Sequence, residues 1–241
     1  MSPFFQGRRV VIGALEEGRF GVLEASVRNG GDDQDTGDGV DPFEGDGDVY
    51  VEKEETMKAT EDLIEEHHAV LVALKILEKV AAAIGAKDGQ APGHLAQLLD
   101  FFKGFVDRCH HGKEEDVLFP ELERRGVKRE GGPIGVMLAE HEIGRGHVRA
   151  MTRGLQDLQG GDPGAADGIS DQARAYREML EAHIQKENQV LFPMADSLVD
   201  KAAAERLVEQ FEVIERERVG EGKHEAYHAM LHSLKEAYGV E

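Results

Sequence analysis

The feature that most constrains this 241-residue chain is an internal repeat in which one pattern of residues occurs twice, 73 positions apart. The first copy reads HHGKEEDVLFP from His110, and the second reads HIQKENQVLFP from His183. Both copies contain the first His, the Lys, the Glu four residues after that His, and a closing Val-Leu-Phe-Pro. The repeat predicts two equivalent structural units, each carrying a His-x-x-x-Glu motif.

A Glu-His pair lies upstream of each copy. Glu66-His67 precedes the first copy and Glu140-His141 precedes the second. The two histidines of a unit are 43 residues apart in the first copy and 42 in the second. This separation is long enough for a helix, a turn and most of a second helix. Each unit is therefore predicted to be a helical hairpin.

The helical prediction follows from the spacing of apolar residues from position 57 onward. Leu63, His67, Val70, Leu74 and Leu77 recur at intervals of three and four, which defines one face of a helix. Gly- and Pro-rich segments interrupt the pattern. Helices are predicted over residues 60–84, 94–125, 134–158, 170–198, 201–219 and 223–238. Four long helices joined by short turns indicate an all-α, up-and-down four-helix bundle with two additional C-terminal helices.

Residues 1–56 have a different composition, with 14 acidic and 5 basic residues. The stretch 30–48 is rich in Gly and Asp and contains no basic residue, so the segment is interpreted as a disordered acidic extension. A short apolar element is expected over 9–23. Asp33, Asp35 and Glu44 fit the first, third and twelfth places of a calcium-binding loop, but Asp38 occupies the place of its essential Gly, which argues against a calcium site.

The composition break suggests three regions: an extension over 1–56, a bundle over 57–198 and a helical extension over 199–241. Met57 stands where the helical pattern begins, and it is a candidate for the authentic start of the protein. Analysis of the intact mass of the native protein would decide that hypothesis.

Charge and cysteine content exclude several classes of function. The formal net charge of −20 argues against general nucleic-acid binding and against docking on anionic membranes. A single cysteine, Cys109, cannot supply a disulfide framework or a multi-cysteine metal site. The apolar run after Arg8 and Arg9 ends at Glu16, so no signal peptide is predicted. A soluble cytoplasmic protein is expected.

The repeated motif carries metal-binding chemistry. Residues four apart lie on one helical face, so His110 and Glu114 can reach a common ion, as can His183 and Glu187. His67 and His141 lie within the apolar faces of their own helices. A lone buried His is usually a hydrogen-bonded core residue, and a lone His-x-x-x-Glu is usually a solvated pair. Their duplication in register favours a metal site, because buried carboxylates are costly unless paired or coordinated.

The identity of the metal follows from the donor set. Mixed imidazole and carboxylate ligands suit iron, manganese or zinc. Four imidazoles and two carboxylates are too many ligands for one tetrahedral zinc ion. They fit two iron ions, each with two histidines, bridged by two carboxylates.

The motifs EEHHAVL, CHHGKEEDVLFP, AEHEIGR and HIQKENQVLFP resemble those of the hemerythrin-like (HHE cation-binding) family over about residues 60–197. The resemblance implies a four-helix bundle around a non-haem di-iron centre. It also implies that Glu114 and Glu187 are the bridging carboxylates. The ligands implied by the resemblance are His67, His110, Glu114, His141, His183 and Glu187.

The sequence departs from oxygen-carrying hemerythrins at two positions. Arg145 occupies the place of the carriers' second His on the third helix, and His147 lies on another side of that helix. Asn188 occupies the place of the carriers' last carboxylate, so Glu187 must serve instead. The resemblance therefore implies a more open and more symmetric centre, with reactive or sensing chemistry favoured over stable oxygen carriage.

Three classes of function follow. The first is a protein that binds or senses oxygen, nitric oxide or redox or iron status. The second is a di-iron enzyme that reduces peroxide or nitric oxide or oxidises iron. The third is a helical interaction protein with a structural metal. The expected partner is a small diatomic molecule or peroxide, and no protein partner is indicated.

Other polar residues have weaker signals. His111 and Glu115 are one step around the helix from the motif, and they are interpreted as groups that orient ligands, as alternate ligands or as polar residues at the helix boundary. Cys109 is interpreted as a small core residue. A stripe on the last helix is interpreted as a solvated or packing face rather than a metal site; it contains His224, His228 and His232.

Overall fold

The computed structural model describes residues 10–15, 19–24, 57–220 and 222–240. The chain divides into two compact units, Met1–Val51 and Glu52–Glu241. The smaller unit contains a two-stranded antiparallel hairpin of β1 (Val10–Leu15) and β2 (Arg19–Glu24). The register pairs Val10 with Glu24 and Leu15 with Arg19.

The hairpin coincides with the short apolar element expected over 9–23 within the N-terminal extension. The β-branched residues Val10, Val11, Ile12 and Val22 favour extended backbone, and each strand is too short to give a strong alternating signal. The acidic stretch 30–48 and the calcium-loop positions Asp33, Asp35 and Glu44 lie outside the described residues.

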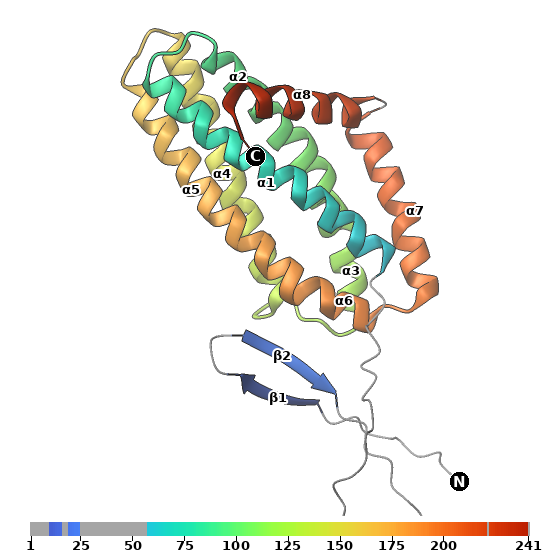
Figure 1. The fold of residues 1–241 in the computed structure, drawn as a ribbon. Coiled ribbons are helices and arrows are strands. Elements are labelled where there is room, and N and C mark those ends of the chain that lie inside the picture. Colours follow the sequence, from blue (N-terminus) through green and yellow to red (C-terminus); the bar gives the residue numbers. More distant parts are fainter. Residues whose placement is uncertain (1–9, 16–18, 25–56, 221, 241) are drawn as a thin grey trace, which may run out of the picture. The chain divides into compact units, whose positions relative to one another are not determined.

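The larger unit is built on four long helices, as predicted (Figure 1). The first is α1 (Lys58–Gly85) and the third is α4 (Pro133–Gln159). The second helix is continuous through α2 (Ala91–Phe101), η1 (Phe102–His111), η2 (Glu114–Leu118) and α3 (Phe119–Arg124). The fourth helix is continuous through α5 (Ala165–Lys186), η3 (Glu187–Leu191) and α6 (Phe192–Leu198). Helix α1 contacts α2 and α5, and α4 contacts the same two helices, which closes the bundle.

The connections are short because specific residues end the helices. Gly126 and Gly161 have φ angles of 94° and 95°, a left-handed conformation that favours glycine and that terminates the second helix and α4. Pro133 lies at the start of α4, where its missing N–H has no intrahelical partner to lose.

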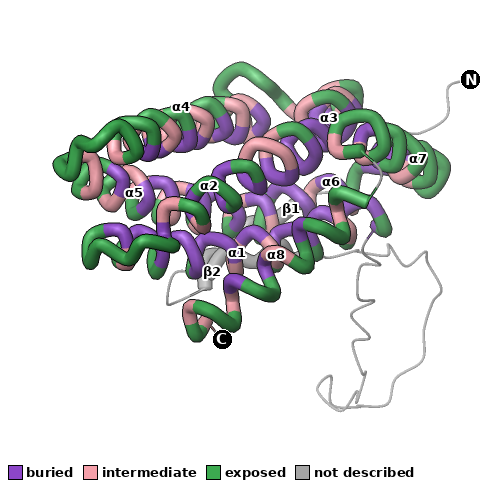
Figure 2. The backbone as a smooth tube through the Cα atoms, turned by 90° about the horizontal axis from the view of Figure 1, so that it is seen from above, coloured by how far each residue is buried: buried purple, intermediate pink, exposed green. Residues whose placement is uncertain are grey.

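The apolar core forms two layers with a polar layer between them. One apolar layer includes Val70, Val106 and Val148, and the other includes Leu63 and Phe119. The buried faces of all four helices point inward along their length (Figure 2). The six predicted ligands occur in sequence between residues of the two layers, so the fold places them at the middle of the bundle.

Three segments of the long helices are π-helical: η1, η2 and η3. The N–H of Phe119 donates to the carbonyl of Glu114, and that of Phe192 donates to the carbonyl of Glu187, each five residues back. Pro120 and Pro193 follow these two phenylalanines. A proline lacks the N–H for the carbonyl four residues before it and clashes with that carbonyl, so the helix widens at the glutamate of each repeat.

The two C-terminal helices, α7 (Lys201–Arg218) and α8 (Lys223–Tyr238), contact the bundle on α1 and the second helix. The side chain of Asp200 caps α7 by accepting from the N–H of Ala203. Both predicted C-terminal helices therefore cover part of the bundle. Across the described residues, no helix has the length and hydropathy needed to span a membrane.

Candidate metal centre

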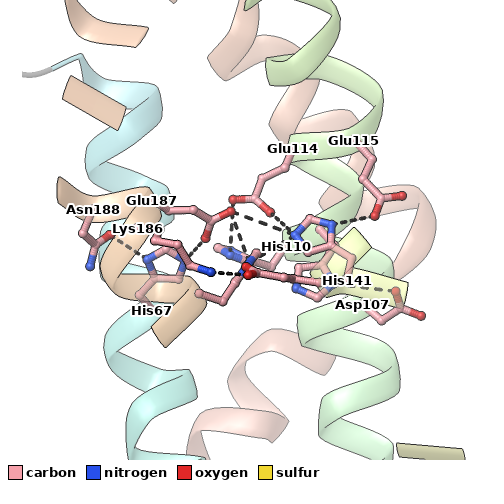
Figure 3. A network of polar contacts seen from close by, with 12 residues as sticks. His67, Asp107, His110, Glu114, Glu115, His141, Lys186, Glu187 and Asn188 are labelled. Atoms are coloured by element: carbon pink, nitrogen blue, oxygen red, sulfur yellow. Dashed lines mark hydrogen bonds and ion pairs between the residues drawn. The ribbon is translucent and has the colours of Figure 1, made fainter. Parts of the chain in front are cut away.

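The structure brings all six predicted ligand residues together in the polar middle layer of the bundle (Figure 3). Their side chains come from α1, the second helix, α4 and the fourth helix. Each residue is at most 2% exposed, so water does not solvate the carboxylates or the imidazoles. The six side chains form two clusters that share a glutamate.

The first cluster contains His67, His110, Glu114 and Glu187. The Nε2 atom of His67 lies 3.2 Å from Oε2 of Glu187. The Nε2 atom of His110 lies 3.6 Å from Oε1 of Glu114. Two imidazole nitrogens and two carboxylate oxygens therefore converge on one position.

The second cluster contains Glu114, His141 and His183, together with His111. The Nε2 atom of His141 lies 3.4 Å from Oε2 of Glu114, and the Nε2 atoms of His141 and His183 are 3.2 Å apart. The Nε2 atom of His183 also lies 3.2 Å from Oε1 of Glu187. The candidate ligand atoms of this cluster are all within 4.8 Å of one another.

The two glutamates connect the clusters. Glu114 directs Oε1 to the first cluster and Oε2 to the second. Glu187 directs Oε2 to the first cluster and Oε1 to the second. This arrangement suits carboxylates that bridge two cations.

The Nδ1 atom of each predicted ligand histidine contacts an oxygen that orients its ring. His110 contacts Glu66 at 2.8 Å, and His183 contacts Glu140 at 3.0 Å. His141 contacts Glu115 at 2.7 Å, and His67 contacts the side-chain oxygen of Asn188 at 2.8 Å. An Nδ1–H that donates to these oxygens leaves the lone pair of Nε2 free to face the centre.

Cationic side chains hold the orienting carboxylates in their ionised form. Burial would raise the pKa of Glu66, but the hydrogen bond from His110 and the charge of Lys113 lower it to about 2. Lys113 Nζ lies 2.5 Å from Glu66 Oε1. Lys186 pairs in the same way with Glu140 in the second repeat. An ionised acceptor requires the Nδ1 atom of its histidine to be the donor.

Arg145 has the same role for Glu115. Its guanidinium contacts Glu115 at 2.8 Å and Asp107 at 2.7 Å. Burial would raise the pKa of Glu115, but hydrogen bonds from His141 and Arg145 lower it. The residue that replaces a histidine of the oxygen carriers thus fixes the carboxylate that orients His141.

The electrostatics of the two central glutamates are unequal, because protein groups compensate the charge of Glu187 but not that of Glu114. Burial and the charge of Glu187 raise the pKa of Glu114 well above its usual range. Burial would also raise the pKa of Glu187, but His183 and His67 lower it strongly. Two buried carboxylates in contact favour sharing a proton, and a cation between them would allow both to ionise.

Unpaired polar atoms test whether these residues fit a bound cation. Among the described residues, both carboxylate oxygens of Glu114 and of Glu187 lack a hydrogen-bond partner, as does Nε2 of His67. Buried groups of this kind are costly unless something outside the chain binds them. The orphaned atoms all point into the two clusters, and their chemistry suits a transition-metal cation.

Glu115, predicted as one possible orienting group, does contact His141, but sequence reasoning missed the other residues that orient the ligands. Lys113 and Lys186 are 73 residues apart and Glu66 and Glu140 are 74 residues apart, and this recurrence was the signal that could have identified them. Asn188, which stands where the oxygen carriers have a carboxylate, orients His67 through its side-chain oxygen.

The residues with weaker signals have different surroundings. Cys109 is fully buried, and burial raises the pKa of its thiol to about 12, as suits a packing residue. His224 lies outside both clusters, where its ring packs on Phe105 and Nδ1 lies 2.9 Å from Glu215. His228 and His232 are exposed.

Comparison with known proteins agrees with this arrangement. Residues 58–195 match the model of the hemerythrin HHE cation-binding domain. Uncharacterized proteins of Mycobacterium tuberculosis and Mycobacterium bovis are 25% identical over 205 residues, which is 85% of this chain and 80% of theirs. The iron-sulfur cluster repair protein YtfE of Edwardsiella ictaluri is 34% identical over 125 residues, which is 49% of this chain and 53% of that protein. The family model covers more than half of the chain, and the protein therefore belongs to the hemerythrin HHE cation-binding domain family.

Proposed function

We propose that the centre holds two iron ions, one in each cluster, with Glu114 and Glu187 as bridges. The observation that carries the proposal is the split of each carboxylate, which directs one oxygen to each pair of imidazoles. The two carboxylates also offset much of the charge of two divalent cations in a site that excludes water. Bound iron would supply reversible one-electron chemistry and open positions for a small molecule.

The protein groups prepare the site for these ions. The orienting oxygens fix each ring with Nε2 toward the centre, so that little reorganisation accompanies binding. Burial lowers the pKa of His110 to about 4 despite its hydrogen bond to Glu66, which keeps its imidazole neutral near pH 7. A neutral imidazole is the form that binds a metal.

We propose that this centre binds or senses oxygen, nitric oxide or cellular redox or iron status. A helical domain with a buried di-iron centre can report such a ligand by binding it stoichiometrically. Cytoplasmic location remains a prediction from the sequence.

The alternative is an enzyme in which the same centre reduces peroxide or nitric oxide or oxidises iron. The relative named as an iron-sulfur cluster repair protein favours this alternative, because repair of a cluster is a chemical activity rather than the sensing of a ligand. Turnover distinguishes the two proposals: a sensor binds about one ligand per centre, whereas an enzyme consumes nitric oxide, peroxide or ferrous iron continuously.

Elemental analysis and visible absorption test the proposal. The native protein should contain about two iron ions per chain, and its reduced form should change its visible spectrum on exposure to air. One zinc ion per chain with no spectral response would leave a structural metal site and refute both redox functions.

Single substitutions test the assignment of ligands. His110→Ala and Glu187→Ala should each lose about one iron ion and lower the stability of the bundle, because the remaining buried ligands lose their partner. His224→Ala, outside both clusters, is the matched control and should keep the full iron content. Full iron content in both ligand variants would refute the ligand set.

A further inference from the structure

His111 is a fifth histidine in the centre. It lies at the end of η1, directly after His110, and it is 4% exposed. Its ring stacks on that of His141, with centroids 3.8 Å apart and an interplanar angle of 11°. Its candidate ligand atom lies within 4.8 Å of those of Glu114, His141 and His183.

The ring nitrogens of His111 are not hydrogen-bonded within the described part of the chain. Among the described residues, neither Nδ1 nor Nε2 has a hydrogen-bond partner. The nearest carboxylate is that of Asp107, 3.8 Å from Nδ1, which exceeds hydrogen-bond distance. The other four histidines of the centre all have an oxygen on Nδ1. A buried imidazole without any partner is costly, and a ligand would remove that cost.

The internal repeat shows that the fold does not require a polar residue here. The position equivalent to His111 in the second copy is Ile184, which is also buried. The imidazole of His111 therefore has no counterpart in the second repeat. It makes the second cluster different from the first.

The π-helical backbone explains why two consecutive histidines reach the same centre. Hydrogen bonds between residues five apart give more residues per turn, so neighbours along the chain are separated by a smaller angle than in an α-helix. His110 and His111 both belong to η1. The first therefore reaches the first cluster while the second reaches the second cluster.

We propose that His111 is the third imidazole ligand of the cation in the second cluster, and that this cation is thereby made inequivalent to the one in the first cluster. The inference rests on the proposed function, because it requires the centre to be loaded. It gives the second cluster three imidazoles and the first cluster two.

A surface cavity adjoins this ligand. The cavity has a volume of about 120 Å³, and it is lined by Phe102, Val106, His111, Gly144, Arg145 and Tyr176 among others. His111 is the member of the second cluster that lines it. A small molecule that enters from this side meets His111 before the other members of the second cluster, so displacement of His111 would open a coordination position toward the cavity.

The test compares the wild-type protein, reconstituted with iron-57, with the His111→Ile variant. Isoleucine is the residue that the second repeat places at the equivalent position, so this variant should fold. Mössbauer spectra should show two distinct iron sites of equal area in the wild type and nearly equivalent sites in the variant. A chelator should remove one iron ion per chain about tenfold or more faster from the variant.

A second variant distinguishes the loss of a ligand from a change in packing. His111→Ala should show the same spectral change, and added imidazole should restore the wild-type spectrum by filling the space next to the cavity. His147→Ala is the matched control, because His147 is half-buried on α4 and its Nδ1 contacts Gln172 outside the centre. It should leave the spectrum and the chelation rate unchanged.

The outcomes separate this inference from the proposed function. If the wild type binds two iron ions and His111→Ile keeps both its spectrum and its chelation rate, His111 is not a ligand and only this inference is overturned. If the wild type does not bind two iron ions, the proposed function fails and this inference fails with it.

Discussion

His110 shows how single residues determine the chemistry of the centre. Its Nδ1 is held by Glu66, which is held in turn by Lys113, and Lys113 also lies 3.3 Å from Glu215 on α7. These alternating charges keep buried Glu66 and Lys113 paired, which is the condition under which buried ions are tolerated. The orientation of one metal ligand thus depends on residues from three helices.

The carboxylate of Glu66 makes a testable contribution to stability. Its folded-state pKa of about 2 lies below the ordinary value of 4.5. Its ionised form therefore stabilises the fold fully above pH 4.5, and this contribution is lost as the pH falls from 4.5 toward 2. In metal-depleted protein at pH 7, Glu66→Gln should lower the unfolding free energy by about 1–3 kcal/mol, because buried Lys113 loses its nearest anion.

Thermal unfolding followed by circular dichroism between pH 3 and pH 7 would measure this contribution. The difference in Tm between wild type and Glu66→Gln should narrow as the pH falls below about 4.5. Glu65→Gln, at the exposed neighbouring position, should change Tm little at any pH. A difference for Glu66→Gln that stays constant with pH would contradict the ionic contribution.

At the residue scale, the sequence predicted which side chains meet but not how they are held. His-x-x-x-Glu and the upstream His are local patterns, and on a helix they place each side chain on the face that points into the bundle. The contacts of Asn188 with His67 and of Glu115 with His141 join residues from different helices. Those contacts depend on the rotation of each helix in the bundle, which periodicity alone does not fix.

At the scale of elements, the sequence predicted regular α-helices and did not predict the π-helical segments within them. The predicted helices 94–125 and 170–198 were treated as regular, and the bounds found are close to these, at Ala91–Arg124 and Ala165–Leu198. The recurrence of apolar residues at intervals of three and four was sufficient to predict that each helix exists. The widened turns at Glu114 and Glu187 follow from Pro120 and Pro193, whose effect inside a continuous helix is a backbone property.

Removal of one proline should convert the π-helical turn at Glu187 into an α-helical turn. Pro193→Ala restores an N–H for the carbonyl of Gln189 and removes the clash that favours the π turn. The turn should then tighten toward α-helix and rotate Glu187 away from the imidazoles. We expect a chelator to remove iron several-fold faster from this variant, while the Tm of the metal-depleted protein does not fall.

Pro133→Ala is the matched control, because Pro133 begins α4 and lies at a position where proline is already favourable. It should leave the rate of iron loss unchanged. Iron loss from Pro193→Ala at the wild-type rate would show that the π segment does not position Glu187.

At the scale of the whole unit, two glycines explain where the C-terminal helices pack. A Cβ atom on Gly104 would collide with the hydroxyl of Tyr227 on α8, and one on Gly112 would meet the guanidinium of Arg218 on α7. Glycine inside a helix costs up to about 1 kcal/mol relative to alanine, and here it permits close approach. The sequence predicted both helices but not their location, because a glycine does not reveal which distant side chain occupies its space.

The packing of α8 predicts that two glycine-to-alanine substitutions change the free energy of unfolding in opposite directions. The ring of Tyr227 is buried against Phe101 and its hydroxyl donates to Asp100 at 3.2 Å, so the ring cannot move aside easily. Gly104→Ala should destabilise the protein by about 1–3 kcal/mol through overpacking, despite its better helix propensity.

Gly168→Ala is the matched control in the interior of α5, where a Cβ atom would meet no atom within 4 Å. It should stabilise the protein by up to about 1 kcal/mol. Urea unfolding of both variants measures the two changes in the free energy of unfolding. If Gly104→Ala were as stabilising as Gly168→Ala, α8 would not pack on the bundle in solution as it does in the structure.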